Sequence, residues 1–284
     1  MSAPVATTTS GTAPAAARAV RLGHRSRAAI LLASVIGLVA FAWPLIAAPG
    51  SSAVAHAGDA PIVFAIVVPV LLLVVLAQVS DGGMDAKAVA MLGVLAAVIA
   101  ALRPLGGGTA GLEPIWVVLI LGGRALGPGF GFCLGAISLF ASALLTGGVG
   151  PWLPFQMLAA AWVGFGAGLL PRASGRRELL LLASYGAVAC VAYGFLLNLW
   201  FWPFTAGLPE QLAFVAGAPL EENLLAWLRF CLITSLGYDI PRAILTVVLI
   251  LVAGRPVLLA LRRMSRKAAF EAPVVFEEAR PPCA

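Results

Sequence analysis

The sequence predicts an all-α polytopic membrane protein with about eight transmembrane helices. Of its 284 residues, 61% are hydrophobic and only 11% are charged, a balance far from that of soluble domains. Several apolar runs approach twenty residues, the length that an α-helix needs to cross a bilayer. A chain in lipid must satisfy its backbone hydrogen bonds internally, and runs of this length favour helices over a barrel.

Eight apolar runs, each bounded by glycine, proline or charge, mark the expected spans. They cover residues 28–48, 61–79, 85–103, 113–126, 129–146, 154–170, 179–202 and 239–261. These runs divide the chain into a disordered cytoplasmic tail, two N-terminal helices, a six-helix membrane core and a cytoplasmic C-terminal tail. The respective ranges are 1–27, 28–80, 85–264 and 265–284.

The positions of Lys and Arg predict the orientation, because cytoplasmic loops retain positive charge. With the N-terminus inside, fifteen of the 18 Lys and Arg fall on the cytoplasmic side, and only Arg103, Arg229 and Arg242 fall outside. We therefore expect a multi-pass protein of the plasma membrane with both termini in the cytoplasm. The charges lie between apolar runs and form no single basic face, so membrane lipid is the expected surrounding and nucleic acid is not an expected partner.

Two further segments bear on the topology. Residues 219–236 are apolar, but a ninth crossing would export the C-terminal basic cluster, so we predict an amphipathic helix at the outer surface or tucked into the bundle. The sequence Ala55-His56-Ala57 has the form of a signal-peptidase site. It lies far beyond the first apolar run, so removal of that run is not expected.

Small residues recur at intervals of three and four in three segments, a spacing that lets helices approach closely. Two of these stripes predict tight crossings inside the bundle: Gly127, Gly131 and Gly135, and Ala160, Gly164 and Gly168. For the third stripe, internal packing is favoured by the residues alone over a docking face for a partner subunit. That stripe consists of Ala86, Ala90, Gly93, Ala97 and Ala100.

Three loops predicted on the outer side carry aromatic and polar groups. Rings can stack on a ring-containing solute, and polar groups can fix its orientation. Interfacial aromatic belts and an ordinary salt bridge between Asp239 and Arg242 are the competing interpretations, whereas Asn198, a lone amide in an apolar run, needs a partner. The candidate solute-binding residues are Arg103, Glu113, Trp116, Trp152, Gln156, Asn198, Trp202, Tyr238, Asp239 and Arg242.

Motifs of common enzyme classes are missing from the sequence. A P-loop lysine follows glycine, but Lys87 and Lys267 follow Ala and Arg, and HExxH, GxSxG and CxxC do not occur. We expect no catalytic residue, metal or cofactor in this chain. Asp81 and Asp85 are spaced like part of a Mg²⁺–diphosphate motif that lacks its second cluster. A membrane enzyme acting on an isoprenoid or lipid diphosphate is therefore one alternative, and a stand-alone secondary transporter is another.

The segment Leu126–Arg172, LGPGFGFCLGAISLFASALLTGGVGPWLPFQMLAAAWVGFGAGLLPR, resembles the substrate-specific S component of energy-coupling factor (ECF) transporters. The resemblance covers roughly two-thirds of the chain, from Asp85 onward. It implies a six-helix protein that captures a vitamin or similar micronutrient from outside and docks on a transmembrane T subunit with two ABC ATPases.

The resemblance also changes the interpretation of the alanine-rich stripe. An AxxxA-type face on the first core helix of the family meets the T subunit, which implies a docking role for Ala86, Ala90 and Ala97. Two N-terminal spans are additional to the family's core. Nickel and cobalt members coordinate metal through a histidine at position two, whereas this chain has Ser2, so a metal cargo is not expected.

Overall fold

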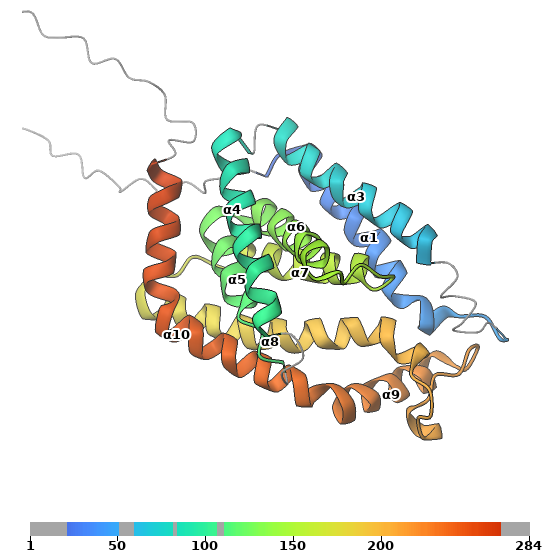
Figure 1. Ribbon diagram of the computed structural model, residues 1–284. Coiled ribbons are helices and arrows are strands. Elements are labelled where there is room, and N and C mark those ends of the chain that lie inside the picture. The colour runs from blue at the N-terminus through green and yellow to red at the C-terminus, as the bar shows by residue number, and fades with distance from the viewer. Residues whose placement is uncertain (1–21, 51–59, 82–83, 107–110, 268–284) are drawn as a thin grey trace, which may run out of the picture.

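The structure is a computed structural model that describes residues 22–50, 60–81, 84–106 and 111–267. Within these ranges every regular element is a helix (Figure 1). The long helices are α1 (His24–Ile46), α3 (Ala60–Ser80), α4 (Ala86–Leu102), α5 (Ile115–Leu126), α6 (Pro128–Thr146), α7 (Leu153–Leu169), α8 (Gly175–Phe201), α9 (Leu220–Phe230) and α10 (Leu236–Lys267). Short 3-10 turns are η1 (Arg103–Gly106), η2 (Trp202–Phe204) and η3 (Glu210–Leu212), and a π-helical turn, η4, covers Cys231–Ser235.

The helices overlap the eight apolar runs, which confirms the all-helical, polytopic prediction. Five helical stretches among the described residues are long and apolar enough to cross a membrane, and the apolar helices Ala65–Ser80, Ile115–Leu126 and Leu153–Leu169 are shorter. The number of crossings, eight, stays a prediction. The five long stretches are His24–Ile46, Ala86–Gly106, Pro128–Thr146, Gly175–Phe204 and Leu220–Met264. The tripeptide Ala55-His56-Ala57 and most of both predicted tails lie outside the described residues.

Successive core helices run in alternating directions, so that their ends collect in two places. At the Arg242 end, α4, α6 and α8 finish and α5, α7 and α10 begin, and contacts such as Arg103–Gln156 and Glu113–Arg242 join them. At the opposite Glu178 end, α5 and α10 finish and α8 begins, joined through Glu178. The two sets of polar contacts are therefore separated by the length of the bundle.

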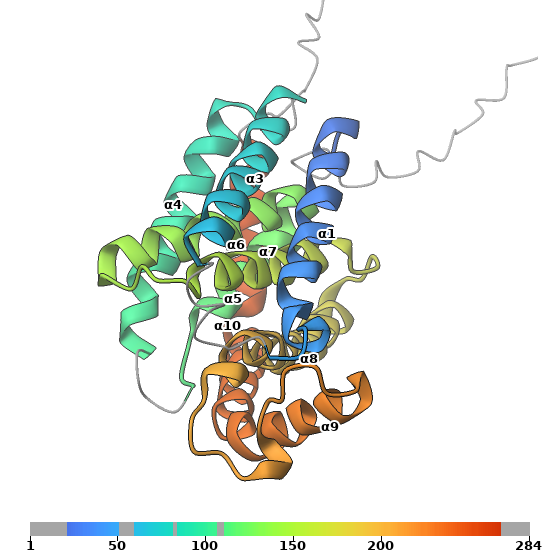
Figure 2. The same ribbon diagram turned by 90° about the vertical axis from the view of Figure 1, so that its right-hand side faces the viewer.

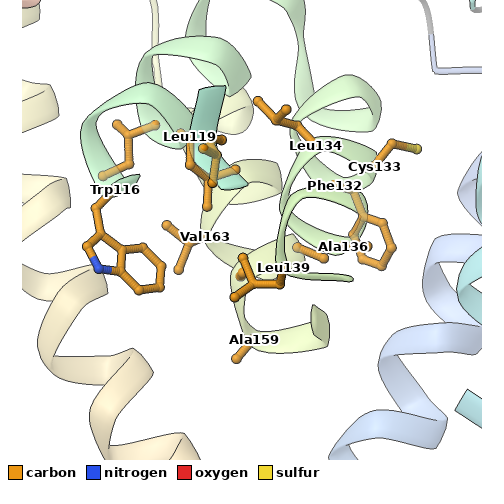
Figure 3. Packing of buried hydrophobic residues seen from close by; sticks show 14 of the residues in the cluster. Trp116, Leu119, Phe132, Cys133, Leu134, Ala136, Leu139, Ala159 and Val163 are labelled. Atoms are coloured by element: carbon orange, nitrogen blue, oxygen red, sulfur yellow. The ribbon is translucent and has the colours of Figure 1, made fainter. Parts of the chain in front are cut away.

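The α6–α7 crossing forms the centre of this bundle. A Cβ on Gly131 would overlap the carbonyl oxygen of Gly164, and a Cβ on Gly164 would overlap that of Gly131. Gly135 lies equally close to the backbone of Ala160. Only residues without a side chain allow helix backbones to approach this closely. The two predicted small-residue stripes are confirmed as a packing surface, and side chains of α5, α6 and α7 fill the space around it (Figure 3).

Helix α5 is short because protein surrounds it. It contacts α4, α6, α7, α8 and α10, and nine of its twelve residues are buried. A helix that hardly meets lipid does not have to match the bilayer thickness. It passes directly into α6 through Gly127, whose φ of 109° suits glycine, and Pro128 occupies the first turn of α6.

The two N-terminal helices, α1 and α3, lie side by side against one flank of the core (Figures 1 and 2). The Trp162 indole nitrogen of α7 donates to the Ser34 hydroxyl oxygen of α1 at 2.9 Å. The rings of Phe41 and Phe155 meet edge to face with centroids 5.0 Å apart. Near the Arg242 end, Trp43 packs against Phe204 and Phe214, with centroids 6.1 and 5.7 Å apart.

Residues 219–236 are helical, as predicted, but they do not form a separate element. Helix α9 continues through the π-turn into α10, which begins at Leu236, three residues before the predicted start of the last span. The Thr234 hydroxyl donates to the carbonyl oxygen of Phe230 at 2.6 Å within this turn, a bond that favours helix bending. Towards its other end α10 changes direction (Figure 1), and the proline in that part of the helix is Pro256.

Replacing Gly164 with valine should unfold or strongly destabilise the protein, by about 3 kcal/mol or more, because the new side chain would overlap the backbone of Gly131. Thermal melting of the purified protein in detergent measures this effect. Gly93→Val is the matched control, since a Cβ at Gly93 meets nothing within 4 Å. Equal melting temperatures for the two variants would contradict the proposed crossing.

Candidate functional site

A charged cluster lies at the Arg242 end, where α8, α10 and the start of α5 meet. The Arg242 Nε donates to Glu113 Oε2 at 3.1 Å, and its Nη1 donates to Asp239 Oδ1 at 2.7 Å. The same Nη1 lies 3.4 Å from the carbonyl oxygen of Cys190. The Ser235 hydroxyl donates to the second Asp239 oxygen at 2.6 Å. The guanidinium is therefore held by two carboxylates that come from different parts of the chain.

Burial in this cluster decreases from Asp239 to Glu113. The exposed fraction of the side chain is 1% for Asp239, 11% for Arg242 and 26% for Glu113. The Asp239 carboxylate rests on Gly194, where a Cβ would overlap it. Burying a carboxylate in an apolar bundle is costly, and the hydrogen bonds to Asp239 offset only part of that cost. Charged groups at such a place are candidates for solute binding.

Two aromatic rings complete the cluster. Trp116 and Tyr193 meet edge to face with centroids 4.4 Å apart, and the Arg242 guanidinium carbon lies 5.9 and 5.5 Å from their respective centroids. The Trp116 indole nitrogen donates to Glu113 Oε2 at 2.8 Å. Both rings are buried. The arrangement combines ring faces with fixed charges, as small-molecule sites commonly do.

A second polar pair, Arg103 and Gln156, joins the end of α4 to the start of α7. The Arg103 Nη2 donates to Gln156 Oε1 at 2.8 Å. The turn η1, which Arg103 begins, packs through Gly106 against the backbone of Leu112 and Glu113, so the pair lies beside the cluster. Six of the ten predicted residues thus come together here: Arg103, Glu113, Trp116, Gln156, Asp239 and Arg242.

The other four predicted residues lie elsewhere at the same end. Trp152 packs against Trp200, with centroids 6.1 Å apart. The Asn198 amide donates to Cys231 Sγ at 3.3 Å and so finds its partner in the π-turn. Trp202 is fully buried, and its indole donates to the carbonyl oxygen of Leu212 at 2.6 Å, which indicates a packing role in the 202–230 segment. Tyr238 is 57% exposed.

Tyr193 and Ser235 belong to the cluster although no sequence pattern selected them. Ser235 precedes Asp239 by four residues, a spacing that places both on one face of a helix. Tyr193 lies in an otherwise apolar run next to Gly194. A phenol in such a run is a signal of the same kind as Asn198, because its hydroxyl needs a polar surrounding.

The Glu178 end holds a second ion cluster, which sequence reasoning also missed. Glu178 is 3% exposed. It accepts from Arg124 Nε of α5 at 2.7 Å, and from Arg262 Nη1 and Nη2 of α10 at 3.0 and 2.6 Å. The Arg124 Nη1 also donates to the carbonyl oxygen of Leu170, the last residue before the loop after α7. This cluster ties three helices together and carries no ring, so we assign it to architecture.

Asp81 and Asp85, the two carboxylates of the alternative in which the protein is an enzyme acting on a diphosphate, both cap helices. Asp85 Oδ1 accepts from the backbone N–H of Ala88 at 2.8 Å and caps α4. Asp81 Oδ2 accepts from the hydroxyl and the backbone N–H of Ser26 at 2.7 and 2.8 Å, which lowers the pKa of Asp81 below its ordinary value. No group of three His, Cys, Asp or Glu within the described ranges could hold a metal ion.

Comparison with known families decides the class of protein. The model of the family "ECF transporter, substrate-specific component" matches residues 87–254, which runs from the first turn of α4 into α10 and contains both ion clusters except Arg262. The chain belongs to this family. The match begins after α1 and α3, so these helices precede the matched S-component range. Comparisons with curated proteins and with solved structures give no match.

The first core helix of this S component, α4, exposes most of its small-residue stripe. Ala86, Ala90, Gly93 and Ala97 are exposed, and a Cβ on Gly93 would meet nothing within 4 Å. The prediction from the residues alone, that the stripe packs internally, is therefore wrong for these four positions. Ala100 is 5% exposed and belongs to the core side of the helix, so it does not extend the exposed stripe.

Replacing Asp239 with alanine should destabilise the S component by about 3 kcal/mol, because it removes a buried partner of Arg242. Asp239→Asn should cost less, since an amide oxygen still accepts from Arg242. Thermal melting of the purified variants gives the comparison. The control is Glu221→Ala, an exposed carboxylate of α9, which should change little. An unchanged melting temperature for Asp239→Ala would show that the cluster contributes nothing to stability.

Proposed function

We propose that this S component captures a vitamin or similar micronutrient from outside the cell and delivers it to a T subunit with two ABC ATPases. The observation that carries the proposal is the cluster of Glu113, Asp239, Arg242, Trp116 and Tyr193 in the membrane core of a chain from this family. Ionised groups within an apolar bundle are costly and often mark a binding site, and this cluster, unlike the one at Glu178, is combined with two aromatic rings. The cluster lies at one end of the helices, where the side chain of its Glu113 is 26% exposed.

Charge asymmetry supports the orientation of this site. The Arg242 end carries few positive charges, whereas most Lys and Arg of the chain lie in segments that belong to the opposite end. Cytoplasmic segments retain positive charge during insertion. The Arg242 end then faces the outside of the plasma membrane, and the Glu178 end and both termini face the cytoplasm.

Energy for transport must come from partner proteins. The sequence has no P-loop, and S components of the family act together with a T subunit and ATPases. The exposed face of Ala86, Ala90, Gly93 and Ala97 on α4 supports docking, because small side chains let a second helix approach closely within lipid. We propose that this face meets the T subunit.

Protein purified from its native membrane should retain a small molecule, which mass spectrometry of the denatured sample detects. Trp152→Ala should retain less of it, because Trp152 belongs to the aromatic group beside Gln156. Val188→Ala, a change at a lipid-facing position that is 69% exposed, should retain the wild-type amount. Uptake of the identified compound should stop when the partner ATPases are inactivated. Uptake that continued without them would favour a stand-alone transporter instead.

Replacing Gly93 with leucine should abolish co-purification with the T subunit and leave the melting temperature unchanged. The reason is that a side chain at Gly93 meets open space within this chain but would separate two closely packed helices. Ala192→Leu, at an exposed small residue of α8, serves as the matched control and should co-purify normally. Equal recovery of the T subunit with both variants would place the docking face elsewhere.

A further inference from the structure

We infer that the solute carries an acidic group, a carboxylate or a phosphate, and that Arg103 binds this group with help from Tyr193 and Gln156. The inference rests on the proposed function, since it names the chemistry of the molecule captured at the same site. An acidic solute is indicated because several hydrogen-bond donors at the Arg242 end have no acceptor among the described residues.

Arg242 cannot supply the main charge for an acidic solute. Its Nε and Nη1 already donate to Glu113 and Asp239, and two carboxylates face one guanidinium. An anion placed against Arg242 would meet both carboxylates at close range, and like charges at such distances repel strongly in an apolar surrounding. Arg242 therefore organises the cluster and stays paired.

Arg103, unlike Arg242, is not paired with a described carboxylate. Its partner in the described part of the chain is the neutral Gln156 amide oxygen, and no ion pair joins it to a described carboxylate. Residues 107–110 carry no charge in the sequence. A guanidinium presents five N–H donors in a planar fork that matches a carboxylate or a phosphate. An acidic solute would give Arg103 the counter-charge that the described residues do not provide.

Tyr193 adds a hydroxyl donor to the cluster at the same end of the bundle. The residue is 6% exposed, and no hydrogen bond joins its hydroxyl to a described residue. The Arg242 guanidinium carbon lies 5.5 Å from the centroid of the Tyr193 ring. A hydroxyl that no described residue engages is available to bond a solute oxygen.

The unused groups of the site are mainly donors. Gln156 accepts from Arg103 through Oε1, which leaves its amide N–H groups free to donate. Glu113 accepts through Oε2 from both Trp116 and Arg242, which leaves Oε1 as an acceptor. Arg103, Tyr193 and Gln156 together offer more donors than Glu113 offers acceptors. This surplus fits a solute rich in acceptor oxygens and with a negative charge, and the rings of Trp116 and Tyr193 lie next to it.

The test compares the small molecules that co-purify with the full-length protein and its variants, identified by mass spectrometry after denaturation. The wild type should release a compound with a carboxylate or a phosphate group, and fragmentation distinguishes the two. Arg103→Met should lower the retained amount at least about tenfold, since a charge-assisted bidentate contact is lost. Arg103→Lys should retain an intermediate amount, and Tyr193→Phe should lower retention severalfold with the ring still present.

Arg229→Met is the matched control, because Arg229 is an exposed arginine of α9 near the same end. It should retain the wild-type amount. The melting temperature of the empty Arg103→Met protein should stay near that of the empty wild type, which excludes a purely structural effect. A neutral or cationic compound in the wild type, or full retention by Arg103→Met, would overturn the inference and leave solute capture intact. A wild type that retains no compound would count against solute capture itself.

Discussion

The backbones of α6 and α7 touch at Gly131 and Gly164, and the positions of the other core helices follow from this contact. Each glycine occupies the space that a side chain on the other would need. Because the pair is so close, α5 can lie against both helices, and Gly123 of α5 also packs on the Gly164 carbonyl. In lipid, where no hydrophobic effect drives helices together, such close packing is a main source of cohesion.

Ion pairs between side chains hold helix α5 at both of its ends. Glu113, just before its start, pairs with Arg242 of α10, and Arg124 near its end pairs with Glu178 of α8. Arg262, further along α10, reaches the same Glu178. The three helices α5, α8 and α10 are therefore joined twice, once at each end of the bundle. A buried ion pair contributes little net stability, but two pairs at a distance fix the register of the helices.

The sequence alone predicted the helices well and the site only in part. Each apolar run overlaps a helix of the structure, because lipid imposes strict rules on composition and length. Six of ten candidate residues, such as Glu113 and Arg242, gather at one place. Trp202 was selected for its ring, yet its burial against Leu212 depends on how the 202–230 segment folds back. Tyr193 was missed because its neighbours come from α5 and α10, and such pairings depend on tertiary packing. Whether the small-residue stripe on α4 faces the bundle or its outside depends on which helices pack against α4, and the sequence pattern does not show this.

The indole of Trp162 and the rings of Phe155, Phe204 and Phe214 have their partners on α1, outside the range shared with the family. One flank of the matched range is thus covered by side chains of α1. A shortened gene that begins at the shared range would leave aromatic surfaces shaped for a neighbour that is no longer there. The shortened protein would therefore expose rings that are packed against α1 in the full chain.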